Sequence, residues 1–306
     1  MKVLIAGGSG FIGRHLSSRL LQDGHEVVVL TRRQQAATSA AVRFATWDGR
    51  TADGGWVNEL DDADAIVNLA GASIGGRRWT GRRKAELLSS RLEPTGAIVQ
   101  AIERRPAGRR PSVLVNASGI DYYRDRRDDA PITEDGPLGT AFLARLCEQW
   151  EAAAIKAEAL GVRVVRIRTS MAFGLGAPAF FLVTLPFRLF VGGPLGDGRQ
   201  WFTWIHIDDL VGLYRLAIQN PRLSGPINAV APDVRRQREL AREMGHVLHR
   251  PSVFPAPAPL LRIALGEQAD LLLHGRHATP VKAQAAGYAF AFGGLHEALE
   301  DLFRRR

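Results

Sequence analysis

The sequence predicts an α/β fold in which a doubly wound parallel sheet carries a smaller substrate-side lobe. A short apolar strand, Lys2–Ala6, runs directly into closely spaced glycines and then into an amphipathic helix. Short apolar strands continue to alternate with helical segments, as expected when helices cover both faces of a parallel sheet. Beyond residue 176, apolar stretches interrupted by proline and glycine replace this alternation and indicate a second, smaller lobe.

The first glycines predict a dinucleotide-binding Rossmann unit. Gly7 allows a tight turn, Gly10 allows the backbone to approach a pyrophosphate, and Gly13 allows the following helix to pack closely on the strand. The helix from Phe11 to about Gln22 then directs its N–H groups and its positive dipole end at the phosphates. A second apolar strand at 25–30 completes the fingerprint, which a glycine triplet alone would not establish.

The end of the second strand favours NADP(H) as the cofactor. Sites that prefer NAD place an acidic residue there for the ribose 2′-hydroxyl, whereas this chain reads Thr31-Arg32-Arg33. A guanidinium group pairs bidentately with a 2′-phosphate, while a carboxylate would repel it. The alternative is a solvated arginine pair in a chain rich in arginine.

Later elements follow the same alternation. We expect strands at 42–46, 65–69, 112–117 and 162–167, and helices at 80–104 and 141–160. The chain returns to the sheet at 204–209, followed by an Asp-capped helix to 219, an extended connector at 251–259, helices near 260–265 and 294–303, and a short segment at 271–275. These elements predict a Rossmann domain at 1–176 with a return segment at 202–230, and a lobe from 177–201 and 231–306.

Composition narrows the class of partner. The net charge of +9 comes from scattered basic pairs without a recognised nucleic-acid module, so we expect no nucleic-acid partner. We expect no membrane partner and a cytoplasmic protein, because neither an apolar run of membrane-spanning length nor a leader is evident. The single cysteine, Cys147, excludes an internal disulfide and a cysteine-based zinc cage, and we expect no metal.

Several motifs together resemble a known family. They are Gly7-Gly-Ser-Gly-Phe-Ile-Gly13, Asn-Leu-Ala-Gly at 68–71, Arg78-Trp79, Ser90-Arg91, Gly-Gly-Pro at 192–194, Gly-Asp-Gly-Arg-Gln at 196–200 and Trp-Ile-His-Ile-Asp-Asp at 204–209. The whole chain is similar to atypical, extended short-chain dehydrogenases/reductases, and more narrowly to the YfcH-like "epimerase family" proteins. The resemblance ends in that family's C-terminal domain of unknown function, around 265–267 and 287–290.

The resemblance assigns a set of cofactor contacts. It implies that the pyrophosphate is held by the first turn, the adenosine phosphate end by 31–33, and the nicotinamide-side ribose by 69–71. Asp48 falls where related proteins contact adenine, although an exposed Asp beside a glycine turn explains it equally well. The implied cofactor residues are Gly7, Ser9, Gly10, Phe11, Ile12, Gly13, Thr31, Arg32, Arg33, Asp48, Leu69, Ala70 and Gly71.

The usual catalytic pair of this family is absent. None of the four tyrosines is followed four positions later by lysine, and the corresponding helix positions hold Leu143 and Cys147. Two markers of nucleotide-sugar binding are replaced by Met171 and Phe202. An uncharged, aromatic-rich pocket is therefore expected, with Trp201, Phe202 and Trp204 nearby.

The remaining catalytic candidates are Ser118, Tyr122 and Tyr123, at the end of the fifth strand and in the following loop. A tyrosine acts as a general acid only if a cation lowers its pKa, and the local cations are Arg124, Arg126 and Arg127. The alternative is that both tyrosines line the pocket with their hydroxyls in solvent. Glu134 is a weaker acid/base candidate, and a helix-side or surface charge explains it more simply. His206 is explained by a structural link between sheet and lobe.

Together, these residues predict an NADP(H)-dependent oxidoreductase that acts on an unidentified small carbonyl or alcohol. The alternative is a non-catalytic NADP(H)-binding regulatory module, because the tyrosine–lysine pair is missing. A nucleotide-sugar epimerase ranks last because of Met171 and Phe202. The expected partner is a small-molecule substrate, and the sequence does not specify an oligomeric state.

Overall fold

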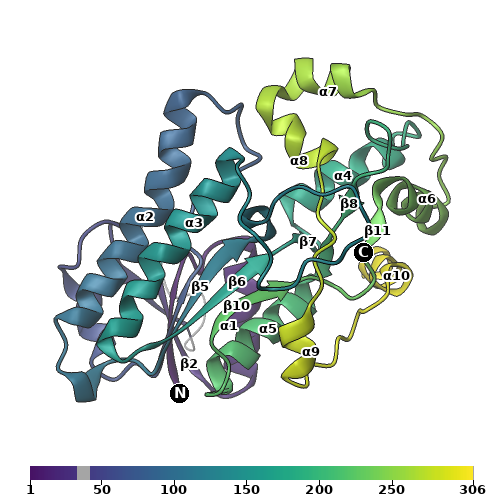
Figure 1. Cartoon of the computed structure of the whole chain (residues 1–306). Coiled ribbons are helices and arrows are strands. Elements are labelled where there is room, and N and C mark those ends of the chain that lie inside the picture. Colours follow the sequence, from purple (N-terminus) through teal and green to yellow (C-terminus); the bar gives the residue numbers. More distant parts are fainter. Residues whose placement is uncertain (33–41, 306) are drawn as a thin grey trace.

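A seven-stranded parallel sheet organises the computed structural model, which describes residues 1–32 and 42–305 (Figure 1). The strand order is β10-β6-β5-β4-β1-β2-β3. The strands are β1 Lys2–Ala6, β2 Glu26–Thr31, β3 Val42–Thr46, β4 Ala65–Asn68, β5 Val113–Gly119, β6 Arg163–Thr169 and β10 Gly225–Ala229. The order reverses between β1 and β4, and ligands of open α/β sheets bind beyond the strand ends at such a switch point.

Helices cover both faces of the sheet, which explains the continuous apolar strands. All five residues of β1 are buried. On one face, α1 (Phe11–Gln22) and α5 (Ile207–Gln219) pack against side chains such as Val3 and Ile5. On the other, α2 (Gly81–Glu103) and α3 (Phe142–Ile155) cover the alternate side chains of the same strands. The predicted doubly wound sheet is therefore confirmed.

Two predicted details of the sheet helices were wrong. The segment expected as one helix at 141–160 ends its α-helical part at Ile155, and the 3₁₀ turn η4 (Lys156–Leu160) leads to Gly161 with φ of +80°. The helix expected to have an Asp cap is capped by the His206 side chain, whose Nδ1 accepts a hydrogen bond from Asp208 N–H at 3.2 Å. The aspartates instead occupy the first turn, where their charge suits the helix dipole.

The second lobe contains more regular structure than its prolines and glycines suggested. A cluster of aromatic and aliphatic side chains holds together three helices of this lobe, at 178–188, 237–248 and 295–304. The sequence analysis did not anticipate α4, α6, α9 or β10. The remaining strands and helices described for the chain are β7 Met171–Phe173, α4 Pro178–Arg188, β8 Trp201–Phe202, β9 Trp204–His206, β11 Arg235–Arg236, α6 Gln237–Leu248, α7 Ala258–Leu265, α8 Asp270–Leu273, α9 Val281–Ala285 and α10 Leu295–Arg304. Further 3₁₀ turns are η1 Gly55–Leu60, η2 Ala107–Arg109, η3 Ile120–Tyr122 and η5 Gly266–Ala269.

His206 joins the sheet region to the C-terminal helix. Its ring is fully buried, its Nε2 lies 3.3 Å from Asp301 Oδ2 on α10, and its ring centroid lies 3.9 Å from that of Phe292. Burial lowers the pKa of His206 below its ordinary value. This placement agrees with the structural link expected from the sequence.

The domain limits drawn at 176 and 230 stay predictions. Ala283 of α9 is buried in the cluster on the sheet, and Tyr288 packs against that cluster. A late segment of the chain thus contributes to the Rossmann core. None of the helices described for residues 1–32 and 42–305 combines the length and apolar character needed to cross a membrane.

Candidate functional site

The first glycine turn has the shape of a phosphate cradle. Gly7 has φ of +76°, and a Cβ there would lie 2.7 Å from the Leu69 carbonyl oxygen. A Cβ on Gly13 would lie 2.5 Å from the Gly8 Cα atom. Gly10, in an extended conformation, caps α1 without a side chain. Because none of these glycines carries a side chain, a pyrophosphate can approach the first N–H groups of α1.

Arg14 and the residues of the first turn of α1 shape the mouth of this cradle. Ser9 and Gly10 are exposed, while Phe11 and Ile12 are half-buried. Arg14 donates through Nη1 to the Ser9 carbonyl at 2.7 Å, which places a cation beside the turn. The first turn of α1 carries no acidic residue, so nothing in it repels an anion.

The loop after β4 forms the opposite wall of the cradle. Leu69 N–H donates to the Ala6 carbonyl at 2.8 Å, and Ala70 N–H donates to Asn68 Oδ1 at 3.2 Å. Asn68 itself is buried and donates to Asn116 Oδ1 on β5 at 2.8 Å. Three neighbouring strands thus hold the 69–71 loop against Gly7, and the ribose contact expected from this loop stays a prediction.

The tip of β2 is described only in part. Thr31 is buried and Arg32 is exposed, whereas Arg33 lies outside the described residues. Asp48 follows β3, the neighbour of β2, and is exposed. Its carboxylate accepts from Arg50 N–H at 2.8 Å and Thr51 N–H at 2.9 Å, which holds the pKa of Asp48 below its ordinary value. An adenine contact from Asp48 stays a prediction.

Ser118 lies at the carboxyl end of β5 in a buried polar network. Its hydroxyl donates to Glu151 Oε1 on α3 at 2.7 Å. Arg168 binds the same carboxylate through both Nε and Nη2, each at 2.8 Å, and both side chains are about 3 % exposed. Since the single Ser118 hydrogen goes to Glu151, its oxygen remains an acceptor for a ligand.

Tyr123 belongs to this network and is fully buried. Its hydroxyl donates to Asn228 Oδ1 and accepts from Arg168 Nη1, both at 2.7 Å. Burial, opposed by Arg168, raises the pKa of Tyr123 to about 12. The alternative that its hydroxyl reaches solvent is wrong, and the buried placement does not suit a proton donor either. Tyr122 is half-buried, and its ring centroid lies 3.6 Å from Arg168 Cζ.

The cation beside the tyrosines is therefore Arg168 rather than an arginine of the adjacent loop. Arg126 pairs with Asp128 at 2.7 Å and Arg127 with Asp197 at 2.9 Å. Glu134 is also not the surface charge expected from the sequence. It is 4 % exposed and accepts from the backbone N–H of Asn228 at 3.1 Å.

A cavity of about 390 Å³ adjoins the cradle, and Phe11 belongs to both. It lies between the carboxyl ends of β5 and β6, helix α3 and the second lobe. Its apolar lining includes Phe11, Leu143, Leu146, Cys147, Trp150, Met171, Trp201 and Phe202; its polar and charged lining includes Arg91, Ser118, Asp121, Thr169, Ser170, Thr203, His274 and Arg276. The expected aromatic pocket is present, but charged residues line it too. Trp204 is fully buried in the core of the lobe.

Leu143 and Cys147, which occupy the positions of the usual catalytic pair, both line this cavity beside Ser118. Cys147 is a buried free thiol, and burial raises its pKa to about 12. Neither side chain supplies a proton at neutral pH. Sequence reasoning missed Glu151, Arg168 and Arg91 as polar groups of this site, because Glu151 and Arg168 meet across 17 residues of chain and no local pattern shows that Arg91 is buried.

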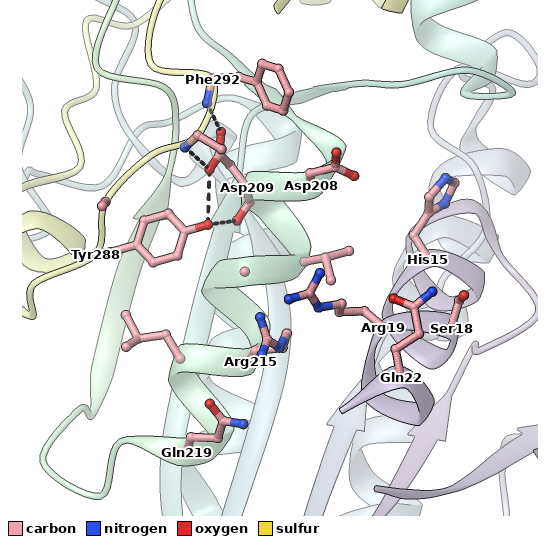
Figure 2. A pocket seen from close by; sticks show the side chains of 15 residues that line it. His15, Ser18, Arg19, Gln22, Asp208, Asp209, Arg215, Gln219, Tyr288 and Phe292 are labelled. Atoms are coloured by element: carbon pink, nitrogen blue, oxygen red, sulfur yellow. Dashed lines mark hydrogen bonds between the residues drawn. The ribbon is translucent and has the colours of Figure 1, made fainter. Parts of the chain in front are cut away.

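A wider groove of about 670 Å³ lies elsewhere, between α1 and α5 (Figure 2). His15, Arg19 and Gln22 line it along α1, away from the glycine turn at the start of that helix. Asp209 is held there by Tyr288 OH at 3.1 Å and by two backbone N–H groups of the C-terminal segment. We place the chemistry in the smaller cavity because ligands of open α/β sheets bind beyond the strand carboxyl ends.

The fold, the glycine cradle and the adjoining cavity define an extended short-chain dehydrogenase/reductase. The model of the NAD dependent epimerase/dehydratase family matches residues 3–230, and that of a domain of unknown function, DUF1731, matches 256–302. The chain therefore belongs to the NAD dependent epimerase/dehydratase family. The expected family resemblance, including its C-terminal domain, is confirmed.

Within this family, the chain is similar to proteins of one branch. It is 38% identical to the chloroplastic epimerase family protein SDR39U1 homolog of Arabidopsis thaliana, over 99% of this chain and 87% of that protein. It is 32% identical to epimerase family protein YfhF of Bacillus subtilis, covering 100% and 99%. The crystal structure of human epimerase family protein SDR39U1 with NADPH shares 35% identity and a TM-score of 0.90, covering 100% of both chains.

Proposed function

We propose that this protein binds NADP(H) in the glycine cradle and exchanges hydride between that cofactor and a small carbonyl or alcohol in the adjoining cavity. The observation that carries the proposal is that Phe11 belongs to both the cradle and the cavity. A nicotinamide held by the cradle and the 69–71 loop would face the cavity. The NADPH in the human relative's structure supports this choice of cofactor.

Ser118 is the group that holds the reacting oxygen of the substrate. Its hydrogen is committed to Glu151, so its oxygen accepts the hydroxyl of an alcohol. The bidentate pair with Arg168 fixes Glu151 and, through it, the orientation of Ser118. Positioning of this kind contributes to catalysis even without a strong acid. The bound cofactor supplies or accepts the hydride, and water in the cavity exchanges the proton.

A second candidate function is a non-catalytic NADP(H)-binding module. It is favoured by one observation: Leu143 and Cys147 replace the usual proton relay in the cavity wall. Under this proposal the cofactor site reports the redox state to a partner. Cytoplasmic location and the absence of nucleic-acid or membrane partners stay predictions for both candidates.

Cofactor binding is tested first, by thermal shift with NADPH, with NADH and without nucleotide. We expect NADPH to raise Tm more than NADH, because ligand binding stabilises the folded state. Arg32→Glu replaces a charge-assisted contact worth about 1.5–3 kcal/mol with a repulsive charge. It should weaken NADPH binding at least tenfold and leave NADH binding unchanged. Equal binding of both nucleotides to the wild-type protein contradicts the assignment of Arg32.

Turnover is tested next, with NADP⁺ and a panel of small alcohols, whose hydroxyl groups can donate to Ser118 Oγ. Loss of one hydrogen bond of about 1.4 kcal/mol in Ser118→Ala should lower kcat roughly tenfold while NADPH affinity stays the same. Ser112→Ala is the matched control, because Ser112 is exposed and precedes the opposite end of β5. If Ser118→Ala matches Ser112→Ala, the role of Ser118 is wrong. NADP(H) binding without turnover of any alcohol favours the non-catalytic module.

A further inference from the structure

Arg91 of α2 is a buried cation in the cavity wall. Arg91 is 8 % exposed, and its Cζ atom lies 5.1 Å from the ring centroid of Trp150. Nη1 donates to the Leu87 carbonyl at 2.9 Å, and Nη2 donates to the Ala72 carbonyl at 3.2 Å. Backbone and an aromatic ring thus fix the side chain, so its position does not depend on a flexible partner.

The charge of Arg91 has no opposite charge beside it in the described parts of the chain, 1–32 and 42–305. Its two Nη atoms donate to backbone carbonyls, and its buried Nε has no hydrogen-bond partner there. Burial accordingly lowers the pKa of Arg91. A buried unpaired charge is costly, and such a charge in a cavity marks a place for an anionic ligand.

The other basic side chains of the cavity already have acidic partners. Arg276 Nη1 lies 2.9 Å from Asp121 Oδ1. His274 lies between Asp125 at 3.5 Å and Asp270 at 3.7 Å. Arg91 therefore gives the cavity one uncompensated positive charge, and the apolar side chains of Leu146 and Trp150 line the same cavity.

Arg91 also lies next to the place where hydride transfer is proposed. A Cβ on Gly71 would be 3.1 Å from Arg91 Cζ, so the guanidinium packs directly against the 69–71 loop. The same cavity is lined by Ser118, which we assign to the reacting oxygen. An anion on Arg91 and a hydroxyl that donates to Ser118 Oγ can thus belong to one small molecule.

We propose that Arg91 binds the carboxylate of the substrate, and that the substrate is a small oxo acid or hydroxy acid with an apolar body. This proposal rests on the proposed oxidoreductase function. In the reductive direction, the carbonyl carbon receives hydride from NADPH, the oxygen receives one proton from water, and NADPH becomes NADP⁺. The carboxylate is unchanged and serves only for binding.

The first experiment measures binding rather than turnover. Full-length protein saturated with NADP⁺ is titrated with 4-phenylbutyrate or with its neutral analogue 4-phenylbutyramide, and Tm and Kd are recorded. We expect the carboxylate to bind at least tenfold more tightly than the amide. Inorganic phosphate, which lacks the apolar body, should produce no shift at the same concentration. Equal binding of carboxylate and amide overturns the proposal.

Variants then assign the preference to Arg91. Arg91→Gln should abolish the difference between carboxylate and amide, and Arg91→Lys, which keeps the charge, should retain part of it. Arg82→Gln is the control, because Arg82 is an exposed arginine of the same helix. If Arg91→Gln does not fold, Arg91→Lys and the wild-type ligand pair still decide the question.

Two further outcomes separate this proposal from its alternatives. If Arg91→Gln weakens NADPH binding tenfold without changing the carboxylate preference, Arg91 serves the cofactor and the proposal is wrong. If carboxylates bind through Arg91 but no oxo acid is reduced, the carboxylate site stands and the oxidoreductase function fails.

Discussion

The sharpest prediction compares one substitution at two helical glycines, Gly13→Ala in α1 and Gly96→Ala in α2. Alanine gains about 1 kcal/mol of helix propensity over glycine at either position. At Gly96 a Cβ meets nothing within 4 Å, so this gain should appear as increased stability. At Gly13 the Cβ would lie 2.5 Å from Gly8 Cα and 2.7 Å from the Gly7 carbonyl oxygen.

Backbone atoms cannot move aside as a flexible side chain would, so overpacking at Gly13 should cost about 1–3 kcal/mol. The two variants should therefore differ by about that amount in the free energy of unfolding, measured in urea. Because the displaced atoms belong to the phosphate cradle, Gly13→Ala should also weaken NADPH binding at least tenfold, or about 1.4 kcal/mol. If Gly13→Ala keeps the stability and the NADPH affinity of the wild-type protein, the predicted overpacking at Gly13 is wrong.

Three other predictions concern buried groups. Glu151→Gln should lower the free energy of unfolding in urea by about 3–5 kcal/mol, because it leaves the buried Arg168 without its charged partner. Glu151→Leu combined with Arg168→Met should recover most of that loss. A loss below about 1 kcal/mol for Glu151→Gln contradicts the predicted role of this ion pair. Because burial lowers the pKa of His206, the unfolded chain takes up a proton at higher pH than the folded chain, so stability falls as pH drops through about 6.5. His206→Asn should reduce this loss between pH 7.5 and 5.5, and an unchanged slope argues against the assignment. Cys147, with a pKa raised to about 12, should react with a thiol reagent at pH 8 only after unfolding, so rapid labelling of the folded protein would show that the thiol is accessible.

The alternation of the first six strands with helices and the glycine cradle could be predicted because their signals are local. The run from Lys2 to Gly13 specifies a strand, a turn and a helix through residues that are neighbours in the chain. The positive φ of Gly7 and the close approach at Gly13 agree with the roles expected from their spacing. Helix α2 was likewise predictable from the periodicity after Thr80, whose side chain accepts from Arg83 N–H at its start.

The cavity could not be predicted in the same way, because its polar groups meet across the fold. Ser118 and Glu151 are 33 residues apart, and Tyr123 and Asn228 are 105 apart. No local pattern reveals that the carboxylate orients the serine or that the second tyrosine points into the interior. Glu134 was read as a surface charge for the same reason.

The sequence alone determined a parallel sheet with a dinucleotide cradle at its carboxyl edge, since periodicity and glycine spacing act over short stretches of chain. Only the tertiary structure decided which polar groups pair and which remain uncompensated. Arg168 is neutralised by Glu151 across two elements, whereas Arg91 meets only backbone carbonyls and a ring. The cost of burying a charge depends on its neighbours in space, and chain folding sets these.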